Sequence, residues 1–273
     1  MKKLKNITCR FASIMLTICI FAAFGGISVQ AKADADPFYG FDIKLYNSET
    51  DLGTSSVNAI VQSSDGYIWL GTYMGLYHYD GTRFSLFGAE NGIVSVRALY
   101  IDKRGNMWIG TNESSVYCYT AQHEFVSYGN EKGLSEKSIR CFTEDANGNI
   151  FVGTAGLSYF ISPEDEVSVV QFDSDITYIT SAAASEDGTI MAVTNSGILA
   201  AYKDGKCLRS ETAIDGSAFD SINYVGDGVF LAGTERFRVY ECSADENRIQ
   251  QKIFANVSPC TAVTNIKPAE NGG

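Results

Sequence analysis

The sequence predicts an all-β protein with the fold of a β-propeller, and three observations support this prediction. First, the octet DGYIWLGT at residues 65–72 recurs as RGNMWIGT, NGNIFVGT, DGTIMAVT and DGVFLAGT. Second, the threonines that close successive octets are 39, 43, 40 and 40 residues apart. Third, glycine is frequent (26 residues) and proline is rare (4 residues), as in a folded, turn-rich chain. A period near 40 residues is typical of propellers, whose blades have four strands each.

The first 31 residues resemble a secretory signal peptide. Four basic residues among the first ten precede an uncharged run at 11–26, and the stretch SVQAKA places a cleavage site after Ala31. The run is shorter than the roughly 20 apolar residues of a membrane span, with an uncleaved anchor as the alternative. Removal of residues 1–31 leaves 17 Lys and Arg against 32 Asp and Glu, a net charge of −15. So acidic an exported chain would repel phosphates, so we expect no nucleic-acid partner.

The first repeat defines the strands expected in every blade. Its pattern predicts strands over residues 56–64, 67–72, 76–80 and 83–88. Asp65 and Gly66 suit a two-residue hairpin turn, because both central positions of such a turn can take positive φ. The aspartates that precede glycine in these turns, Asp65, Asp187 and Asp227, are expected to cap the turns, with calcium ligation as the alternative.

Two positions of the octet predict how the blades pack. The glycine of Gly-Thr lies at a strand end, where it allows a close backbone approach or a bend. The register of Trp69 is filled in later repeats by Trp108, Phe151, Met191 and Leu231. Large apolar residues at one repeated position indicate packing between blades, and a ligand platform would not tolerate such replacement.

The repeats divide the chain into five recognisable blades and part of a sixth. The blades are expected at residues 54–93, 94–134, 135–176, 177–218 and 219–259, with a partial blade at 260–273. Residues 32–53 form an N-terminal segment, and its stretch 41–53 has the pattern of the outer strand of a closing blade. The other strands of that blade are not found, so we expect an incomplete, open propeller cut from a longer protein. Its unpaired edges could drive self-association.

The cysteines give little support to a metal site or a disulfide framework. Outside the signal peptide there are five: Cys118, Cys141, Cys207, Cys242 and Cys260. They show no CxxC spacing and no neighbouring His cluster, so we expect single thiols in strands and neither a metal nor a cofactor. An exported location permits a disulfide, but the sequence assigns none.

The repeat SVNAIVQSSDGYIWLGTYMGLYHYDGTRF resembles the two-component regulator propeller repeat. That repeat has an apolar first strand, a turn with Asp and Gly, the run I-W-[IL]-G-T, then G-L-x-x-[YF]-D and an aromatic fourth strand. Residues 57–93 fit well, and residues 94–134 and 135–176 fit in part. The fourth and fifth repeats have drifted: MAVT lacks the glycine, and ERFRVY lacks Gly-Leu. The resemblance covers residues 41–273.

The resemblance implies a sensor on the periplasmic or extracellular side of a bacterial membrane. In that family, tandem propellers outside the cell are followed by a further β-domain, a membrane helix and an intracellular output module. The output is typically a histidine kinase or a diguanylate cyclase, and many of these sensors answer to carbohydrate. We find none of the downstream parts in this sequence, so contact with a membrane is expected only through missing C-terminal parts.

A ligand is expected on the face formed by two sets of loops. In a propeller, the loops that lead into the innermost strand and those between the second and third strands share one face. Aromatic, amide and charged groups there suit a small polar molecule or a glycan. The candidate residues are Tyr73, Met74, Arg97, Asn112, Glu113, Ser114, Glu136, Tyr178, Asn195, Ser196, Glu235 and Arg236.

The sequence favours a binding protein over an enzyme. The two histidines, His78 and His123, occupy unmatched positions in different repeats, and no G-x-S-x-G, HExxH or Gly-rich phosphate loop occurs. We therefore expect no catalytic residues. A protein-interaction scaffold is the main alternative function, followed by a propeller hydrolase or lyase.

Overall fold

The computed structural model describes most of the chain after residue 43. The described residues are 44–50, 52–87, 90, 92–112, 115–135, 138–172, 176–245, 248–257 and 262–266. The predicted signal peptide and most of segment 32–53 therefore lie outside them. The chain divides into two compact units, residues 1–45 and 46–273, and every described strand belongs to the second unit. None of the helical residues that the structure describes forms a helix able to cross a membrane.

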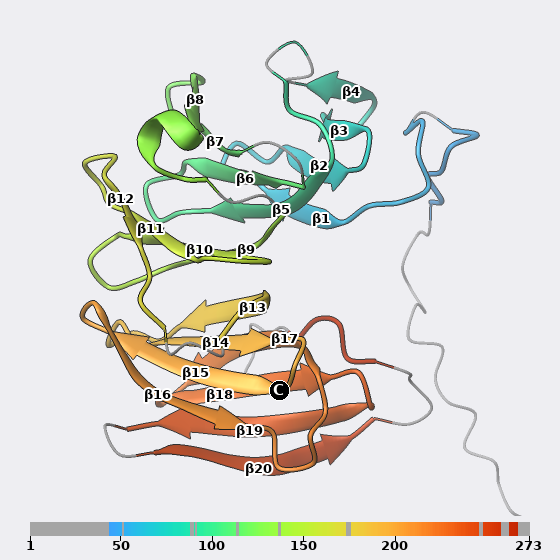
Figure 1. The fold of residues 1–273 in the computed structure, drawn as a ribbon. Helices are drawn as coiled ribbons and strands as arrows, with labels where there is room; N and C mark the ends of the chain where they lie inside the picture. Colours follow the sequence, from blue (N-terminus) through green and yellow to red (C-terminus); the bar gives the residue numbers. More distant parts are fainter. Residues whose placement is uncertain are drawn as a thin grey trace, which may run out of the picture. The chain divides into compact units, whose positions relative to one another are not determined.

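Five four-stranded antiparallel sheets make up the second unit, in chain order (Figure 1). The first blade contains β1 (Ala59–Gln62), β2 (Ile68–Thr72), β3 (Gly75–Tyr79) and β4 (Phe84–Phe87). The second contains β5 (Val96–Ile101), β6 (Met107–Thr111), β7 (Val116–Tyr119) and β8 (Phe125–Tyr128), followed by the 3-10 turn η2 (Asn130–Lys132). The third contains β9 (Ile139–Glu144), β10 (Ile150–Thr154), β11 (Tyr159–Ile161) and β12 (Val167–Val169).

The last two blades repeat the same order with longer strands. The fourth contains β13 (Ile179–Ala184), β14 (Ile190–Thr194), β15 (Ile198–Lys203) and β16 (Lys206–Thr212). The fifth contains β17 (Phe219–Gly226), β18 (Val229–Thr234), β19 (Arg238–Ala244) and β20 (Ile249–Asn256). Strand order within each sheet follows the chain, so each blade is a simple meander, and the predicted all-β propeller with five blades is confirmed.

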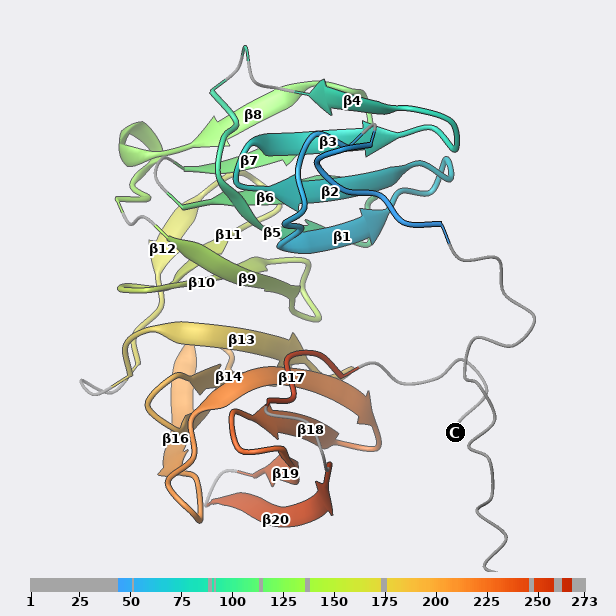
Figure 2. The ribbon, with the colours of Figure 1, turned by 90° about the vertical axis from the view of Figure 1, so that its right-hand side faces the viewer.

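The first strands of the blades lie next to one another and line the inside of the unit. β1, β5, β9, β13 and β17 make contact in that order (Figure 2). Residues 262–266 then lie beside β17: Ser221 Oγ donates to the carbonyl of Val263 and Asn223 Nδ2 to that of Ile266, both at 2.8 Å. This segment therefore occupies the position of the first strand of a sixth blade.

The glycine of the Gly-Thr pair is required by the close approach of the next blade. A Cβ on Gly71 would lie 2.6 Å from Val96 Cγ1, and one on Gly110 would lie 2.5 Å from Ile139 Cγ2. A Cβ on Gly233 would meet Val263 in the same way, at 2.6 Å. Val96 and Ile139 are each the first residue of the next innermost strand. Of the two predicted roles, the close approach is therefore the one observed.

The Trp register packs one blade on the next, as predicted, in four of the five blades. Trp69 shares a core cluster with Val96 and Ile109 of the second blade, and Trp108 shares one with Ile150 of the third. Phe151 and Met191 are fully buried in equivalent clusters. Leu231 is only partly buried, and its cross-strand neighbour Glu241 forms an ion pair with Lys252 at 2.7 Å.

The predicted turn type is wrong for four of the five blades. In the first blade, Ser63 N donates to Tyr67 O (3.0 Å) and Gly66 N to Ser63 O (2.9 Å), which closes a three-residue loop with only the glycine at positive φ. The second, third and fourth blades repeat this pattern. Among these five turns, only that of the fifth blade has two successive positive-φ residues, Asp227 and Gly228. Of the aspartates expected to cap turns, Asp187 Oδ1 accepts the Thr189 N–H at 3.0 Å and Asp65 Oδ1 accepts the Ser63 hydroxyl, while capping by Asp227 stays a prediction. In the second blade, Asp102 at the start of the turn accepts the backbone N–H groups of Arg104 and Asn106.

The end of the N-terminal segment packs on the first blade without forming a strand among residues 44–50 and 52–53. The Tyr46 hydroxyl lies 2.7 Å from that of Tyr79, and the Tyr46 ring packs edge-on against Phe84. Leu52 is buried against Leu70. Pairing of residues 41–53 with a closing blade stays a prediction.

The cysteines that the structure describes are thiols within strands, as expected. They are Cys118, Cys141, Cys207 and Cys242, and Cys260 lies outside the described residues. Burial raises the pKa of Cys118 and of Cys242 to about 12. Such thiols stay protonated at neutral pH and are poor nucleophiles.

Candidate ligand-binding face

The residue just before the innermost strand has a left-handed backbone conformation in the second, third and fourth blades. Ser95, Ser138 and Tyr178 each adopt positive φ, at 52°, 58° and 57°. The residue after each of them begins the innermost strand and is fully buried against the preceding blade. Left-handed backbone at a non-glycine residue costs free energy and persists only where the surrounding structure enforces it, so this repeated geometry marks the face as a specialised region.

The residue after the buried one sits in a β-bulge. The pairing of the first two strands shifts register between Val96 and Ala98, and the same shift occurs at the corresponding place in the third, fourth and fifth blades. A bulge leaves one residue unpaired and redirects its side chain, and bulges often lie beside functional sites. The four bulge residues are Arg97, Arg140, Thr180 and Asp220.

Backbone hydrogen bonds join the two sets of loops that the sequence places on this face. Ser95 N donates to Tyr73 O (3.2 Å), and Asn112 N donates to Ser95 O (2.9 Å). Ser138 N then donates to Asn112 O (3.0 Å), and on the fifth blade Glu235 N donates to Ala218 O (3.2 Å). The loops after the second strands of the first, second, third and fifth blades are thus tied to the start of an innermost strand, either that of the same blade or that of the next.

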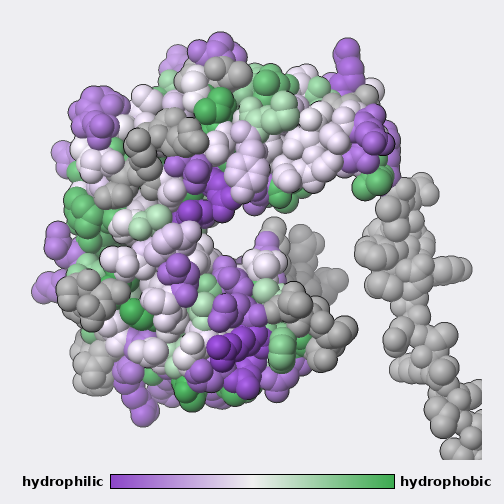
Figure 3. All heavy atoms as spheres, turned by 45° about the vertical axis from the view of Figure 1, so that its right-hand side comes forward, coloured by the Kyte–Doolittle hydropathy of each residue, from purple (hydrophilic) through white to green (hydrophobic). Residues whose placement is uncertain are grey.

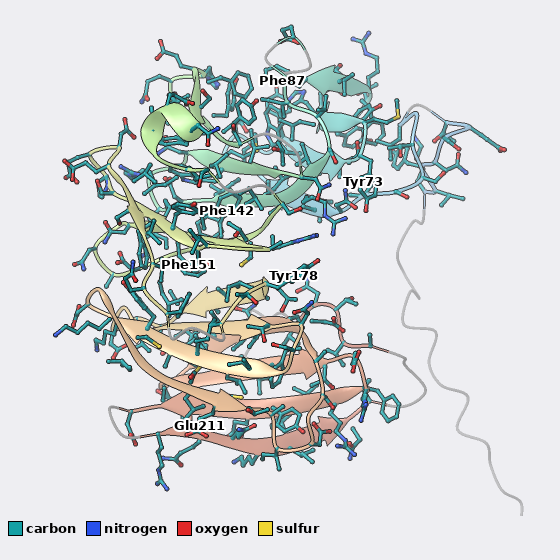
Figure 4. All side chains as sticks on the ribbon, viewed as in Figure 1. Tyr73, Phe87, Phe142, Phe151, Tyr178 and Glu211 are labelled. Atoms are coloured by element: carbon teal, nitrogen blue, oxygen red, sulfur yellow. The ribbon has the colours of Figure 1, made fainter. Side chains whose placement is uncertain are left out.

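Aromatic and basic side chains from neighbouring blades meet on this face. Arg97 Nη1 donates to the Tyr73 hydroxyl, and its guanidinium lies 5.5 Å from the centre of the Tyr73 ring. The Arg140 guanidinium lies 5.0 Å from the centre of the Tyr178 ring. Tyr73 and Tyr178 lie along the same edge of the unit (Figure 4). Each pair joins two adjacent blades.

A cavity of about 450 Å³ opens between the innermost strands. The unit is hollowed between its blades, and hydrophilic residues border the hollow (Figure 3). Arg140, Thr180 and Asp220 line this cavity, together with Asn223 and Asn265. Burial, followed by repulsion from the Glu235 carboxylate, raises the pKa of Asp220. The volume of the cavity falls within the ~300–1,000 Å³ of small-molecule sites.

The other predicted residues take more peripheral positions. Met74 is exposed and touches the Tyr77 hydroxyl, and Ser196 Oγ lies 2.9 Å from Thr194 Oγ1 within its own turn. Glu235 and Arg236 are exposed and 3.8 Å apart. Asn195 is also exposed. Glu113, Ser114 and Glu136 lie outside the described residues, so their place on the face stays a prediction.

Sequence reasoning missed Arg140, Thr180 and Asp220. A signal was present, because each repeat follows the first apolar residue of its innermost strand with a polar one, in the pairs VR, IR, IT and FD. Such a pair looks like ordinary alternation of a half-buried strand. Only the bulge, which the sequence does not reveal, distinguishes a polar residue that faces the cavity from one that faces solvent.

A second cleft, of about 410 Å³, lies between the first two blades at their hairpin turns. Both histidines line it, with aromatic neighbours: His78 packs on Tyr67 and Trp69, and His123 Nδ1 lies 3.0 Å from the Tyr119 hydroxyl. The two histidines unmatched in sequence are therefore neighbours across a blade boundary. No group of three or more His, Cys, Asp or Glu able to hold a metal occurs in the part of the chain that is described.

Three segments match the family model described as two component regulator propeller. They are residues 51–74, 91–113 and 133–156, which cover the first two strands of the first three blades. These three segments therefore match the two-component regulator propeller repeat, as the resemblance implied. None of the curated proteins compared with the chain matches it.

Solved structures of low sequence identity share the fold. The extracellular domain of a hybrid two component system from B. thetaiotaomicron is 18% identical, with a TM-score of 0.55 over 85% of this chain and 37% of that one. A second such domain is 20% identical, with a TM-score of 0.57 over 70% and 28%. Virginiamycin B lyase from Staphylococcus aureus is 12% identical, with a TM-score of 0.57 over 71% and 68%. The chain thus spans about a third of the extracellular domains and about two thirds of the lyase.

Proposed function

We propose that the chain is the ligand-binding part of an extracytoplasmic sensor of a bacterial signal-transduction receptor. The observation that carries this proposal is the repeated bulge, which directs Arg97, Arg140, Thr180 and Asp220 toward one face. Bulges often redirect a side chain beside a functional site, and three of these four residues line the cavity. The family of the repeats and the apolar N-terminal run agree with an exported sensor.

The proposed ligand is a small polar molecule, with carbohydrate as one class. The cavity offers guanidinium, carboxyl, hydroxyl and amide groups, and the Tyr178 ring lies against the guanidinium of Arg140. Such a mixture supports binding through many hydrogen bonds and ring contacts.

A ligand screen by thermal shift tests the proposal. The protein is heated with a panel of saccharides, sugar acids, amino acids and their neutral analogues, and hits are confirmed by calorimetry. A binder should raise the Tm, and simultaneous replacement of Arg97 and Arg140 by Met should abolish the shift. A panel without any binder would count against a sensor and favour the interaction scaffold. Turnover of a confirmed binder would instead favour an enzyme.

A further inference from the structure

Arg140 is a half-buried cation that lacks a charged partner among the described residues. Its Nε atom is buried and makes no hydrogen bond, and the one interaction described for its side chain is the contact with the Tyr178 ring. Arg97, at the same position of the preceding blade, instead donates to the Tyr73 hydroxyl. A buried donor left unsatisfied costs free energy, so its persistence calls for an explanation by function.

Asp220 is an acidic counterpart in the same cavity. It is half-buried, and no ion pair within the described part of the chain involves it. Its charged neighbour is Glu235, which has the same sign. The cavity therefore holds a cation and an anion that do not neutralise each other. A bound molecule with complementary groups would satisfy both.

The geometry of the Arg140 guanidinium and the Asp220 carboxylate limits the chemical class of the ligand. A guanidinium presents parallel N–H groups that fit the two oxygens of a carboxylate, and this pairing is stronger than a neutral hydrogen bond. The Tyr178 ring lies against the guanidinium, which restricts the positions that the guanidinium can take. A carboxylate such as that of Asp220 accepts hydrogen bonds from hydroxyl or ammonium groups. The net charge of the chain, −11, would repel anions in general, so a retained arginine here points to local recognition.

We propose that the ligand carries a carboxylate, which Arg140 binds, and a hydroxyl or ammonium group, which donates to Asp220. This inference rests on the proposed sensor function. A cavity of about 450 Å³ accommodates a molecule the size of an amino acid or a monosaccharide acid. These two sources share the chemistry and differ in the donor offered to Asp220.

Pairs of ligands that differ only in the carboxylate test whether this group is recognised. Calorimetry compares each α-amino acid with its amide and each sugar acid with its parent sugar. The acid should bind at least tenfold more tightly than the neutral analogue, since a charge-assisted pair is worth about 1.5–3 kcal/mol. Amino acids alone would identify an ammonium donor, and sugar acids alone a hydroxyl donor.

Variants assign the effect to the two residues. Arg140→Met should weaken the acid roughly 10- to 100-fold while leaving its neutral analogue unchanged, and Arg140→Lys should restore part of the loss. Arg83→Met, at an exposed turn, is the control and should bind like the wild type. Asp220→Asn should weaken binding and yet raise the Tm of the free protein, because it removes repulsion from Glu235. A purely structural Asp220 would instead lower the Tm.

The outcomes separate this inference from the sensor proposal. Equal binding of acid and neutral analogue, or wild-type affinity in Arg140→Met, would overturn the carboxylate and leave the sensor intact. Binding of neutral molecules alone would do the same. A chain that binds nothing would overturn both.

Discussion

The first three blades match the family repeat and the fourth does not, yet all four have the same architecture. The clearest difference is at the Gly-Thr position, where Gly71, Gly110 and Gly153 give way to Val193. In the first three blades the glycine leaves room for the next innermost strand. Val193 is fully buried in a core cluster that includes Ala183, Ala201 and Phe219.

This difference indicates that contacts between blades depend on the total side-chain volume at the contact and not on the identity of each residue. Alanines fill much of the cluster around Val193, so a larger residue at one position accompanies smaller ones nearby. Cores commonly tolerate such exchanges if the total volume is kept. The motif is therefore one solution to the packing of two blades, and the fourth blade uses another.

The largest loss of stability is expected from adding a methyl group at a Gly-Thr glycine of the first three blades. In Gly110→Ala the new Cβ would lie 2.5 Å from Ile139 Cγ2 and 2.8 Å from Ile139 Cβ. The blades must separate, so the free energy of unfolding should fall by about 3 kcal/mol, at the upper end of overpacking effects. Urea denaturation followed by circular dichroism measures the change.

Two variants sharpen this prediction. Gly105→Ala meets nothing within 4 Å and should cost only about 1 kcal/mol, because of its positive φ. Val193→Ala should also destabilise, through the void it leaves. Wild-type stability in Gly110→Ala would show that blade spacing adapts freely, which would remove the volume argument.

A smaller loss of stability is expected from substitutions at the Trp register, and the loss should differ between the second and the fifth blade. Trp108 is buried, and its indole Nε1 donates to the buried Asp102 carboxylate at 3.0 Å. Trp108→Phe removes this hydrogen bond and should cost about 1–2 kcal/mol. Leu231→Ala, at the same register on a partly exposed face, should cost less than about 1 kcal/mol. The same denaturation measurement applies, and a larger loss at Leu231 would contradict the proposed difference between the blades.

The sequence predicts the propeller well because its repeat is directly visible. The 40-residue period, the strand order and the packing role of Trp69 all follow from one recurring octet. The turn type was not predictable in the same way. Asp65-Gly66 and Asp227-Gly228 look alike in sequence, but the first pair belongs to a three-residue loop and the second forms a two-residue turn.

The candidate site was predictable only in part, for a related reason. Tyr73, Arg97 and Tyr178 lie where repeats diverge, and the face on which they meet follows from the topology of any propeller. Arg140 and Asp220 lie inside strands, where a polar residue is ordinarily directed to solvent. Only a one-residue register shift places them in the cavity, and such a shift depends on pairing with the neighbouring strand.

The smallest expected effect is the pH dependence of one turn, which separates the fourth blade from the first. The pKa of Asp187 is lowered, first by Lys203 Nζ at 2.7 Å and then by Ser185 Oγ at 2.6 Å. The pKa of Asp65 is lowered mainly by Ser63 Oγ, without a lysine. A carboxyl group with a lowered folded-state pKa stabilises above its ordinary pKa, near 3.8, and this stability is lost as the pH falls below it.

Lys203→Met should therefore cost about 0.2–1 kcal/mol at pH 7, the range of exposed ion pairs, and almost nothing once Asp187 is protonated. The cost should also shrink in roughly 1 M salt, because Asp187 is largely exposed. Denaturation at several pH values measures it, with Lys252→Met in the fifth blade as a second exposed lysine that pairs with a glutamate. If the cost of Lys203→Met were the same at neutral pH and well below the ordinary pKa of an aspartate, the lysine would act through its aliphatic chain, and the charge difference between the two turns would have no energetic consequence.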